Sequence, residues 1–220
     1  MSLGYDPLTS FLTPFSENQK IIIILVVIQC MKAVLLAAGE GNRLKPITSS
    51  RPKPMVPLAG KPLLEHTLLG LRDAGIDHVL LIVGYMQEVI KNYFKDGKER
   101  LGIKIEYVTQ EEYLGTAHAT NYARDFVDND QFMLIYGDLL VDSLVFSEVV
   151  TTFKKTNPSG LITLREVEAP QNYGIISLNE ESFVEKITEK TLLDKVDKLG
   201  NLANTGISVF NSDIFDAIDK

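Results

Sequence analysis

Two glycines and two cations stand near one another where the first apolar segment after Met31 ends. Gly39 and Gly41 directly follow the run Lys32–Ala37, and Arg43 and Lys53 come shortly after them. Glycine lets the backbone turn sharply and bring its N–H groups close to phosphate oxygens. Arginine offers phosphate a planar fork of donors, and lysine offers a point charge. These residue types in this order favour a loop that binds phosphate groups.

This loop does not match the two common glycine-rich phosphate motifs. No Gly-Lys-Ser or Gly-Lys-Thr follows it, so it is not a Walker A loop. The third glycine of the dinucleotide fingerprint would fall at Leu44, and the prolines at positions 46, 52, 54 and 57 break the helix that should follow. A Gly-x-Gly after a strand also occurs in ordinary turns, so Arg43 and Lys53 carry the functional interpretation.

Motifs spread from Met31 to about Phe210 resemble, in order, those of the sugar-1-phosphate nucleotidyltransferases, also called NDP-sugar pyrophosphorylases. The resemblance is closest to glucose-1-phosphate thymidylyltransferases and N-acetylglucosamine-1-phosphate uridylyltransferases. The motifs are Gly39-x-Gly41-x-Arg43-Leu44 with Pro52-Lys53-Pro54, Gln110-Glu-Glu-Tyr-Leu-Gly115-Thr116-Ala-His118-Ala, Gly137-Asp138, Asn172-Tyr173-Gly174 with Phe183-Val-Glu185-Lys186, and Asn204-Thr205-Gly206-Ile207. Each motif is short, and their shared order is what carries the resemblance.

The resemblance implies an enzyme that transfers a nucleotidyl group from UTP or dTTP to a sugar 1-phosphate and releases pyrophosphate. Glucose-1-phosphate and N-acetylglucosamine-1-phosphate are the implied acceptors, and Mg²⁺ is the implied cofactor. The implied catalytic residues are Arg43 for the departing pyrophosphate, Lys53 and Lys186 for the two reacting phosphates, and Asp138 as the magnesium ligand. A carboxylate suits Mg²⁺ because this hard cation prefers oxygen ligands.

The implied binding residues form two groups. Those for the nucleotide are Leu36, Ala37, Ala38, Gly39, Gly41, Gln110, Gly115 and Thr116. Those for the sugar are Tyr173, Gly174, Glu185, Asn204, Thr205 and Gly206. The amide of Gln110 both donates and accepts hydrogen bonds, which suits the N3–H and O4 edge of uracil or thymine. The sequence therefore favours a pyrimidine nucleotide and does not decide between uracil and thymine.

Two other functions are compatible with the same motifs. One is a catalytically silent module that regulates or scaffolds other subunits, and the other is a guanylyltransferase that forms GDP-mannose. Retention of the four charged residues Arg43, Lys53, Asp138 and Lys186 argues against a silent module. Gln110 and the histidine of the Gly-Thr-Ala-His segment make the guanylyltransferase the less favoured enzyme.

Composition limits the partners and the compartment. The chain has 220 residues and a formal net charge of −7, which argues against broad nucleic-acid binding. Its single cysteine permits no intrachain disulfide and fits a reducing compartment, so we expect a cytoplasmic protein. The apolar run at residues 21–28 is too short for a bilayer, which takes about 20 residues. The expected partners are a nucleoside triphosphate and a sugar 1-phosphate, with no nucleic acid and no membrane, and a homo-oligomer is compatible with all of this.

We expect two regions in the chain. Residues 1–30 form an N-terminal extension, which is either an added strand or tail, or a segment that precedes a natural start at Met31. Residues 31–220 form the nucleotidyltransferase domain, which we expect to be truncated at its C-terminal end. The resemblance places a second metal ligand well beyond Asn204, and Asp213, Asp216 and Asp219 have the spacing of one solvated helix face.

Alternating strands and helices must position these residues. Strands are expected at Lys32–Ala37, His78–Val83, Lys104–Thr109, 131–136 and Gly160–Glu166, then at 174–178, 183–188 and 206–210. Helices are expected from Pro62 to Gly75, around 89–94, after Gly115, over 147–156 and after a capping Ser212, and the charged residues 96–100 are expected to form a solvated loop. This βα order predicts an α/β protein with a Rossmann-like mixed, mostly parallel sheet flanked by helices, the nucleotide-diphospho-sugar transferase fold.

Overall fold

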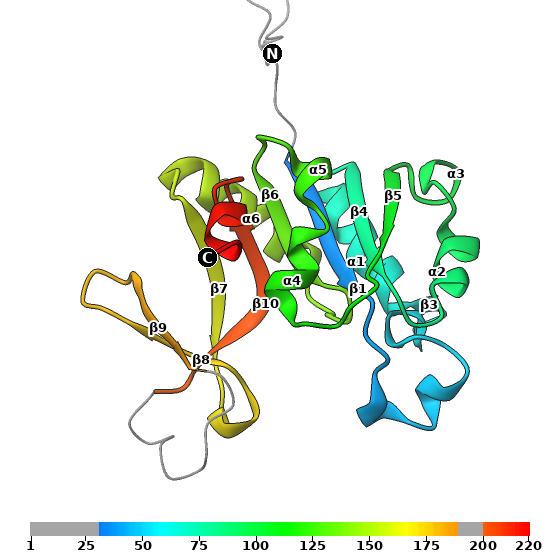
Figure 1. The fold of residues 1–220 in the computed structure, drawn as a ribbon, viewed down its shortest axis with the longest axis horizontal. Helices are drawn as coiled ribbons and strands as arrows, with labels where there is room; N and C mark the ends of the chain where they lie inside the picture. The colour runs from blue at the N-terminus through cyan, green and yellow to red at the C-terminus, as the bar shows by residue number, and fades with distance from the viewer. Residues whose placement is uncertain (1–30, 189–199) are drawn as a thin grey trace, which may run out of the picture.

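The computed structural model describes residues 31–188 and 200–220, apart from the Arg43 side chain. The expectations for residues 1–30 lie outside this part of the chain. Within the described ranges, one mixed sheet of eight strands forms the centre of the molecule, in the order β5-β4-β1-β6-β10-β8-β9, with β7 paired to β10 (Figure 1). The strands are β1 Lys32–Ala37, β4 His78–Val83, β5 Lys104–Thr109, β6 Phe132–Tyr136, β7 Gly160–Glu166, β8 Ile175–Leu178, β9 Val184–Thr188 and β10 Leu202–Phe210.

The direction of the strands changes across the sheet. Strands β5, β4, β1 and β6 are parallel neighbours. Strand β10 is antiparallel to β6, β7 and β8, and β8 is antiparallel to β9. The expected α/β fold with a mixed sheet is therefore confirmed, and its parallel strands form the half of the sheet from β5 to β6. The β8–β9 hairpin projects from the end of the sheet that lies far from β5 (Figure 1).

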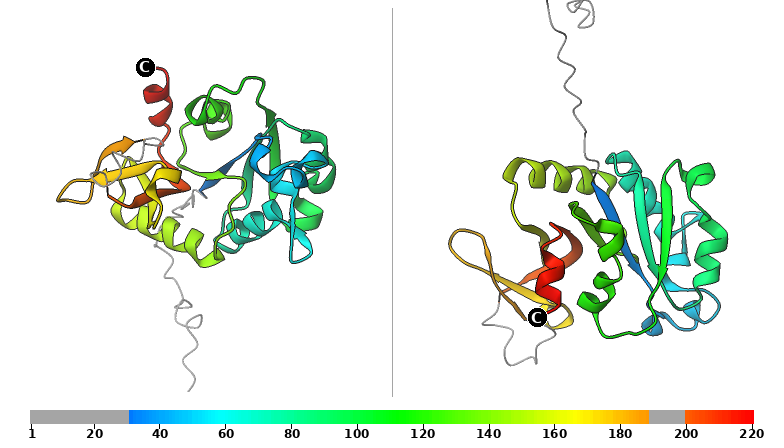
Figure 2. Two further views of the ribbon diagram at one scale, coloured as in Figure 1. Left: turned by 90° about the horizontal axis from the view of Figure 1, so that it is seen from below. Right: turned by 45° about the horizontal axis from the view of Figure 1, so that its top comes forward.

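Helices cover both faces of the sheet (Figures 1 and 2). The described helices are α1 Leu63–Asp73, α2 Gln87–Phe94, α3 Lys98–Leu101, α4 Thr116–Asn121, α5 Arg124–Val127, α6 Ser143–Thr156 and α7 Ile214–Ile218. Successive strand residues point to opposite faces, so Leu35 packs in the core beneath α1 and α6, whereas Val34 packs in the core beneath α5 and α7. Burial on both faces explains why the central strands read as unbroken apolar runs.

Short elements connect this framework to the glycine loop. They are the 3₁₀ turns η2 Asn42–Leu44, η3 Ile47–Ser49, η4 Lys53–Met55 and η5 Pro170–Asn172, and a small hairpin of β2 Pro57–Leu58 and β3 Lys61–Pro62. The segment between β1 and α1 is thus a chain of tight turns, as its prolines require.

Several expected boundaries are wrong. The helix expected over 147–156 begins at Ser143, because the Asp142 carboxylate accepts a hydrogen bond from the Leu144 N–H at 2.9 Å and caps it. The helix expected after Gly115 is two short helices, α4 and α5. The expected loop at 96–100 includes the start of α3. The last helix begins at Ile214, and no side chain caps it, so Ser212 does not have the capping role.

Strand β10 also begins earlier than expected. It starts at Leu202, so Asn204 and Thr205 lie inside the strand and do not precede it. The register between β10 and β7 shifts between Asn204 and Ser208, which marks a bulge at this place. An isolated glycine in a strand pattern often marks such a bulge. Gly206 accordingly lies inside β10 and is not the strand start that the sequence predicts.

Candidate active site

A cleft of about 740 Å³ opens at the carboxyl ends of β1 and β6. These two strands are parallel neighbours, and the chain runs from β1 to β4 and β5 on one side before it returns to β6 on the other. Such a reversal of strand order leaves a crevice in which α/β proteins bind ligands. The lining residues are Leu36, Ala37, Gly39, Gly41, Asn42, Leu44, Lys53, Pro54, Thr116, Tyr136 and Asp138. The structure therefore brings most of the expected phosphate-binding residues to one place.

The glycine loop folds tightly against the segment that carries Lys53. Gly41 has φ +70°, and a Cβ at this position would stand 2.9 Å from the Lys53 Cβ. Thr48 is fully buried, and its hydroxyl donates a hydrogen bond to the Gly41 carbonyl at 3.0 Å. A residue with a side chain would meet both an unfavourable backbone conformation and a steric conflict at position 41. This glycine is therefore required by the fold of the loop.

A second set of contacts holds the outer side of the loop. The Glu40 carboxylate accepts hydrogen bonds at 2.9 Å from the Lys45 ammonium and from the Asn42 amide. These donors, that of Lys45 first, hold the pKa of Glu40 below its usual value. The Arg43 backbone lies in η2, and its side chain is outside the described part of the structure. The role assigned to Arg43 stays a prediction.

Lys53 and Asp138 approach each other across the cleft and form an ion pair. Lys53 begins η4, and Asp138 follows the end of β6. Both side chains are about one-third exposed, at 33% each. Gly137 lets the chain pass close over β1, because its N–H donates to the Leu36 carbonyl at 2.9 Å and a Cβ would stand 2.9 Å from the same oxygen. The Gly-Asp motif thus delivers one carboxylate into the cleft.

Asp138 is the one acidic side chain that lines this cleft among the described residues. No group of three or more His, Cys, Asp or Glu side chains in those residues could enclose a metal ion. Mg²⁺ is commonly held by one or two carboxylates together with phosphate oxygens and water, and a lone carboxylate at a phosphate-binding loop fits that pattern. The donor set therefore suits Mg²⁺ that arrives with a nucleotide.

The segment assigned to the base lies beside the cleft and is folded on itself. Gln110 is only 7% exposed, its N–H donates to the Val83 carbonyl at 2.8 Å, and its side-chain amide donates to the Glu112 carbonyl at 2.9 Å. One of the Gln110 amide donors that suit a pyrimidine is thus already bonded to Glu112 within the loop. Gly115 precedes α4 with φ +108°, and Thr116 lines the cleft.

The residues assigned to the sugar do not line this cleft. Tyr173 stacks with the Arg165 guanidinium, whose carbon lies 5.2 Å from the ring centroid, and Gly174 follows it just before β8. Glu185 and Lys186 are exposed on β9, in the projecting hairpin (Figure 1). The structure therefore separates the assigned residues into a group at the cleft and a group on β8, β9 and β10.

Gly206 connects the second group to the first. The Asn204 side-chain oxygen accepts a hydrogen bond from the Gly206 N–H at 2.8 Å, and the Thr205 hydroxyl bonds to Thr163 on β7. Gly206 has φ +86°, and a Cβ there would stand 2.6 Å from the Tyr136 ring. Tyr136 lines the cleft and was not among the residues expected from sequence. The sequence signal that identifies Tyr136 is its position directly before the Gly137-Asp138 motif.

Asn42, Leu44 and Pro54 are further lining residues that had no assigned role. All of them lie within the first motif, each next to a glycine or cation that has an assigned role. Among residues 31–188 and 200–220, no helix has the length and apolar character needed to cross a membrane.

Comparison with known proteins identifies relatives of the whole described region. The family model described as nucleotidyl transferase matches residues 32–220. The low-salt glycan biosynthesis nucleotidyltransferase Agl11 of Haloferax volcanii is 39% identical over 191 residues, which are 86% of this chain and 52% of that protein. The bifunctional protein GlmU of Methanococcus maripaludis is 36% identical over 190 residues, which are 86% of this chain and 42% of that protein.

A guanylyltransferase and a solved structure are also similar. The catalytic subunit beta of mannose-1-phosphate guanylyltransferase from Xenopus tropicalis is 35% identical over 191 residues, 86% of this chain and 52% of that subunit. A Bacillus anthracis protein assigned as a glucose-1-phosphate thymidylyltransferase, crystallised with sucrose, superposes with a TM-score of 0.77 at 28% identity, covering 87% of this chain and 75% of that one. The chain spans about half the length of the curated relatives it matches. The match over residues 32–220 confirms the resemblance drawn from the motifs, and the chain belongs to the nucleotidyl transferase family.

Proposed function

We propose that this chain carries the catalytic site of a sugar-1-phosphate nucleotidyltransferase. The observation that supports this most directly is the meeting of Lys53 and Asp138 at the crevice between β1 and β6. A cation and a carboxylate that converge on a glycine loop suit a bound triphosphate and its metal ion. A silent scaffold has no need of such a pair.

In the proposed reaction, a phosphate oxygen of the sugar 1-phosphate attacks the α-phosphorus of the nucleotide in line. The bond from the α-phosphorus to the bridging oxygen breaks, and pyrophosphate leaves with the electron pair. The chain needs no covalent nucleophile, so its residues act by positioning and by neutralising charge. Mg²⁺, when bound to Asp138, supplies further neutralisation of the phosphate oxygens.

The described residues suit these tasks in different ways. Backbone N–H groups between Gly39 and Gly41 suit the nucleotide phosphates, and Lys53 suits the phosphate that is attacked. We propose that Arg43 stabilises pyrophosphate and that Lys186 binds the sugar phosphate, with Glu185 and Asn204 near the sugar hydroxyls. Lys186 is exposed on β9, which suits contact with a phosphate.

We propose UTP or dTTP as the nucleotide and glucose-1-phosphate or N-acetylglucosamine-1-phosphate as the acceptor. The support is the Gln110 side-chain amide, which donates one N–H to the Glu112 carbonyl at 2.9 Å and keeps its oxygen and its second N–H for a base edge. A site built to pair with one base edge disfavours a base that leaves its polar groups unpaired. The similarity to a mannose-1-phosphate guanylyltransferase keeps GTP as the alternative to be tested.

The test is a pyrophosphate-release assay over four nucleotides, UTP, dTTP, GTP and ATP, each with glucose-, N-acetylglucosamine- and mannose-1-phosphate. We expect a pyrimidine nucleotide to be preferred, and we expect Gln110→Ala to lose that preference. Glu112→Gln is the matched control, because Glu112 contacts Gln110 through its backbone carbonyl alone. A preference for GTP with mannose-1-phosphate would instead support the guanylyltransferase.

A further inference from the structure

A second pocket lies behind the segment that carries Lys53. It has a volume of about 420 Å³ and is bounded by Arg51, Met55, Pro57, Lys61, Val89 and Tyr93, among others. Its residues come from the turns before α1 and from α2, whereas the cleft lies at the ends of β1 and β6. The two pockets have no lining residue in common. This pocket is therefore a separate cavity with no role in the proposed reaction.

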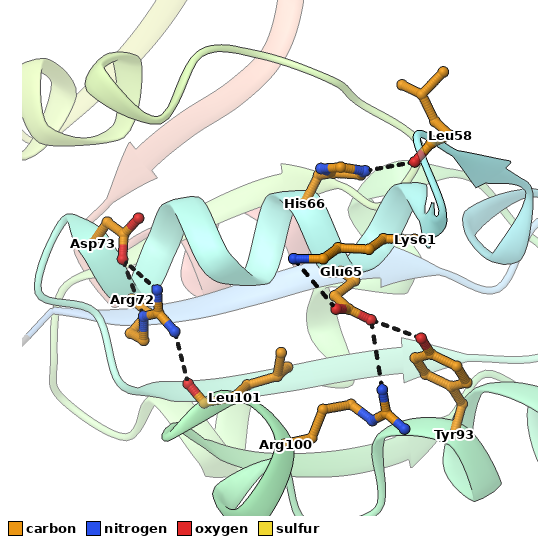
Figure 3. Close-up of polar contacts among 9 residues, drawn as sticks. All are labelled: Leu58, Lys61, Glu65, His66, Arg72, Asp73, Tyr93, Arg100 and Leu101. Atoms are coloured by element: carbon orange, nitrogen blue, oxygen red, sulfur yellow. Dashed lines mark hydrogen bonds and ion pairs between the residues drawn. The ribbon is translucent and has the colours of Figure 1, made fainter.

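Its charge is positive. The Arg51 side chain is exposed and makes no ion pair with any described residue. The Lys61 side chain is 48% exposed, and its ammonium lies 3.9 Å from the Glu65 carboxylate, which is a loose contact. Glu65 is buried and already accepts a hydrogen bond from the Tyr93 hydroxyl at 2.8 Å and lies 3.9 Å from the Arg100 guanidinium (Figure 3). The buried Glu65 carboxylate is thus shared between Lys61 and Arg100. Arg51 and Lys61, the two cations that line the pocket, have capacity for an anion.

The floor of the pocket is apolar. Met55 is only 7% exposed, and Pro57 and Val89 stand beside it. A ligand that fits this surface combines an anionic head with a small apolar body. A phosphate monoester matches the head best, because its oxygens can accept the two parallel donors of an arginine and a further bond from a lysine.

The pocket and the cleft share one short segment of chain. Arg51 and Met55 line the pocket, whereas Lys53 and Pro54 between them line the cleft. The Val56 N–H donates to the Lys53 carbonyl at 3.1 Å, which keeps the segment in a tight turn. A ligand that holds Arg51 would therefore restrain the turn from which Lys53 reaches the cleft.

We propose that this pocket is a binding site for a phosphate monoester with a small apolar body, held by Arg51 and Lys61. The binding itself does not depend on the proposed nucleotidyl transfer. Phenyl phosphate is the probe, because it has the required head and body. Binding is followed by the methyl resonances of Val89, which lines this pocket and does not line the cleft.

We expect phenyl phosphate to shift the Val89 methyl resonances with higher affinity than inorganic phosphate, and phenol to leave them unchanged. Arg51→Gln should weaken binding about tenfold, the loss typical of one charge-assisted hydrogen bond. Lys61→Gln gives an independent variant at the second cation that lines the pocket. Lys98→Gln is the matched control, because Lys98 is exposed and does not line the pocket.

Lys53→Gln distinguishes this pocket from the cleft, which also attracts phosphate. Binding that survives Lys53→Gln and weakens in Arg51→Gln and Lys61→Gln supports the proposal. Binding that is lost in Lys53→Gln and retained in the other two belongs to the cleft and overturns it. Equal shifts with phenol would overturn it as well, since they would show that the apolar floor binds without the cations. Each of these outcomes can be interpreted even if the chain shows no nucleotidyl transfer activity.

Discussion

Replacing Lys53 by glutamine should have opposite effects on turnover and on metal binding. The Lys53 ammonium pairs with the Asp138 carboxylate. In the proposed reaction the same ammonium stabilises a phosphate, so its loss should reduce turnover by about 10²- to 10³-fold, as for one preorganised electrostatic contact. A metal ion at Asp138, however, competes with Lys53 for the carboxylate. Removing the lysine should therefore make metal binding tighter when no nucleotide is present.

The size of the second effect follows from the exposure of the pair. Each side chain is 33% exposed, so solvent screens the attraction strongly. Two unit charges about 4 Å apart attract by about 1 kcal/mol in water and about 4 kcal/mol near a protein surface. Double-mutant measurements of exposed pairs give about 0.2 to 1 kcal/mol. We take about 1 kcal/mol, which corresponds to about a fivefold lower Kd for the metal.

Mn²⁺ is the measurable substitute for Mg²⁺, since its free and bound forms differ in electron paramagnetic resonance. The titration compares the unmodified chain with Lys53→Gln, in the absence of nucleotide. Asp138→Asn should abolish the site, and Lys45→Gln is the matched control because Lys45 pairs with Glu40 and not with Asp138. An unchanged or weaker Mn²⁺ affinity in Lys53→Gln would refute the reasoning, whatever its turnover.

Two further predictions concern stability. Gly206→Ala should be more destabilising in urea than Gly75→Ala by about 1–3 kcal/mol. Both positions have φ above +80°, but only at Gly206 would an added Cβ stand 2.6 Å from the Tyr136 ring, so equal losses would remove the steric argument. Burial, and then the charge of Asp96, raises the pKa of Tyr107 to about 12. Because the unfolded value is about 10, the stability from this neutral phenol is complete below about pH 10 and is lost as pH rises through about 12. Urea unfolding against pH should show this loss in the unmodified chain, and its absence in Tyr107→Phe; parallel curves for the two chains would contradict the assignment.

Four strands, β1, β4, β5 and β7, have the bounds that the sequence indicates. For β1 and β4 the reason is burial on both faces, because such runs are apolar throughout and glycine or polar residues end them sharply. The place of the site followed from the same signal, because glycines and charges that come directly after parallel strands meet at one edge of the sheet.

Boundaries that depend on tertiary contacts were not predictable in this way. Helix α6 begins four residues before the expected 147, at Ser143, and its early turn includes Phe146, which is buried against Gly70 of α1. A Cβ at Gly70 would stand 2.8 Å from that ring, so the two helices approach closely there. Nothing in the local sequence announces this contact, since residue 70 and residue 146 are far apart in the chain.

The sequence predicts which residue types form the site, but it does not predict which of their side chains already bond to other residues of the chain. A sequence motif assigns each side chain to a ligand as though it were free, yet several are engaged within the chain. Lys53 holds Asp138, Gln110 donates to Glu112, and Thr205 bonds to Thr163. A ligand must replace these contacts, so its affinity is the difference between the contacts it makes and those it displaces. The same contacts hold these polar side chains in place before a ligand binds, which reduces the cost of ordering them on binding. The exposed β9 residues, which lack such ion pairs among the described residues, carry that cost in full. We therefore expect substitutions at Lys53 to tighten metal binding and to weaken nucleotide binding. Substitutions on β9 should weaken the binding of the sugar phosphate alone.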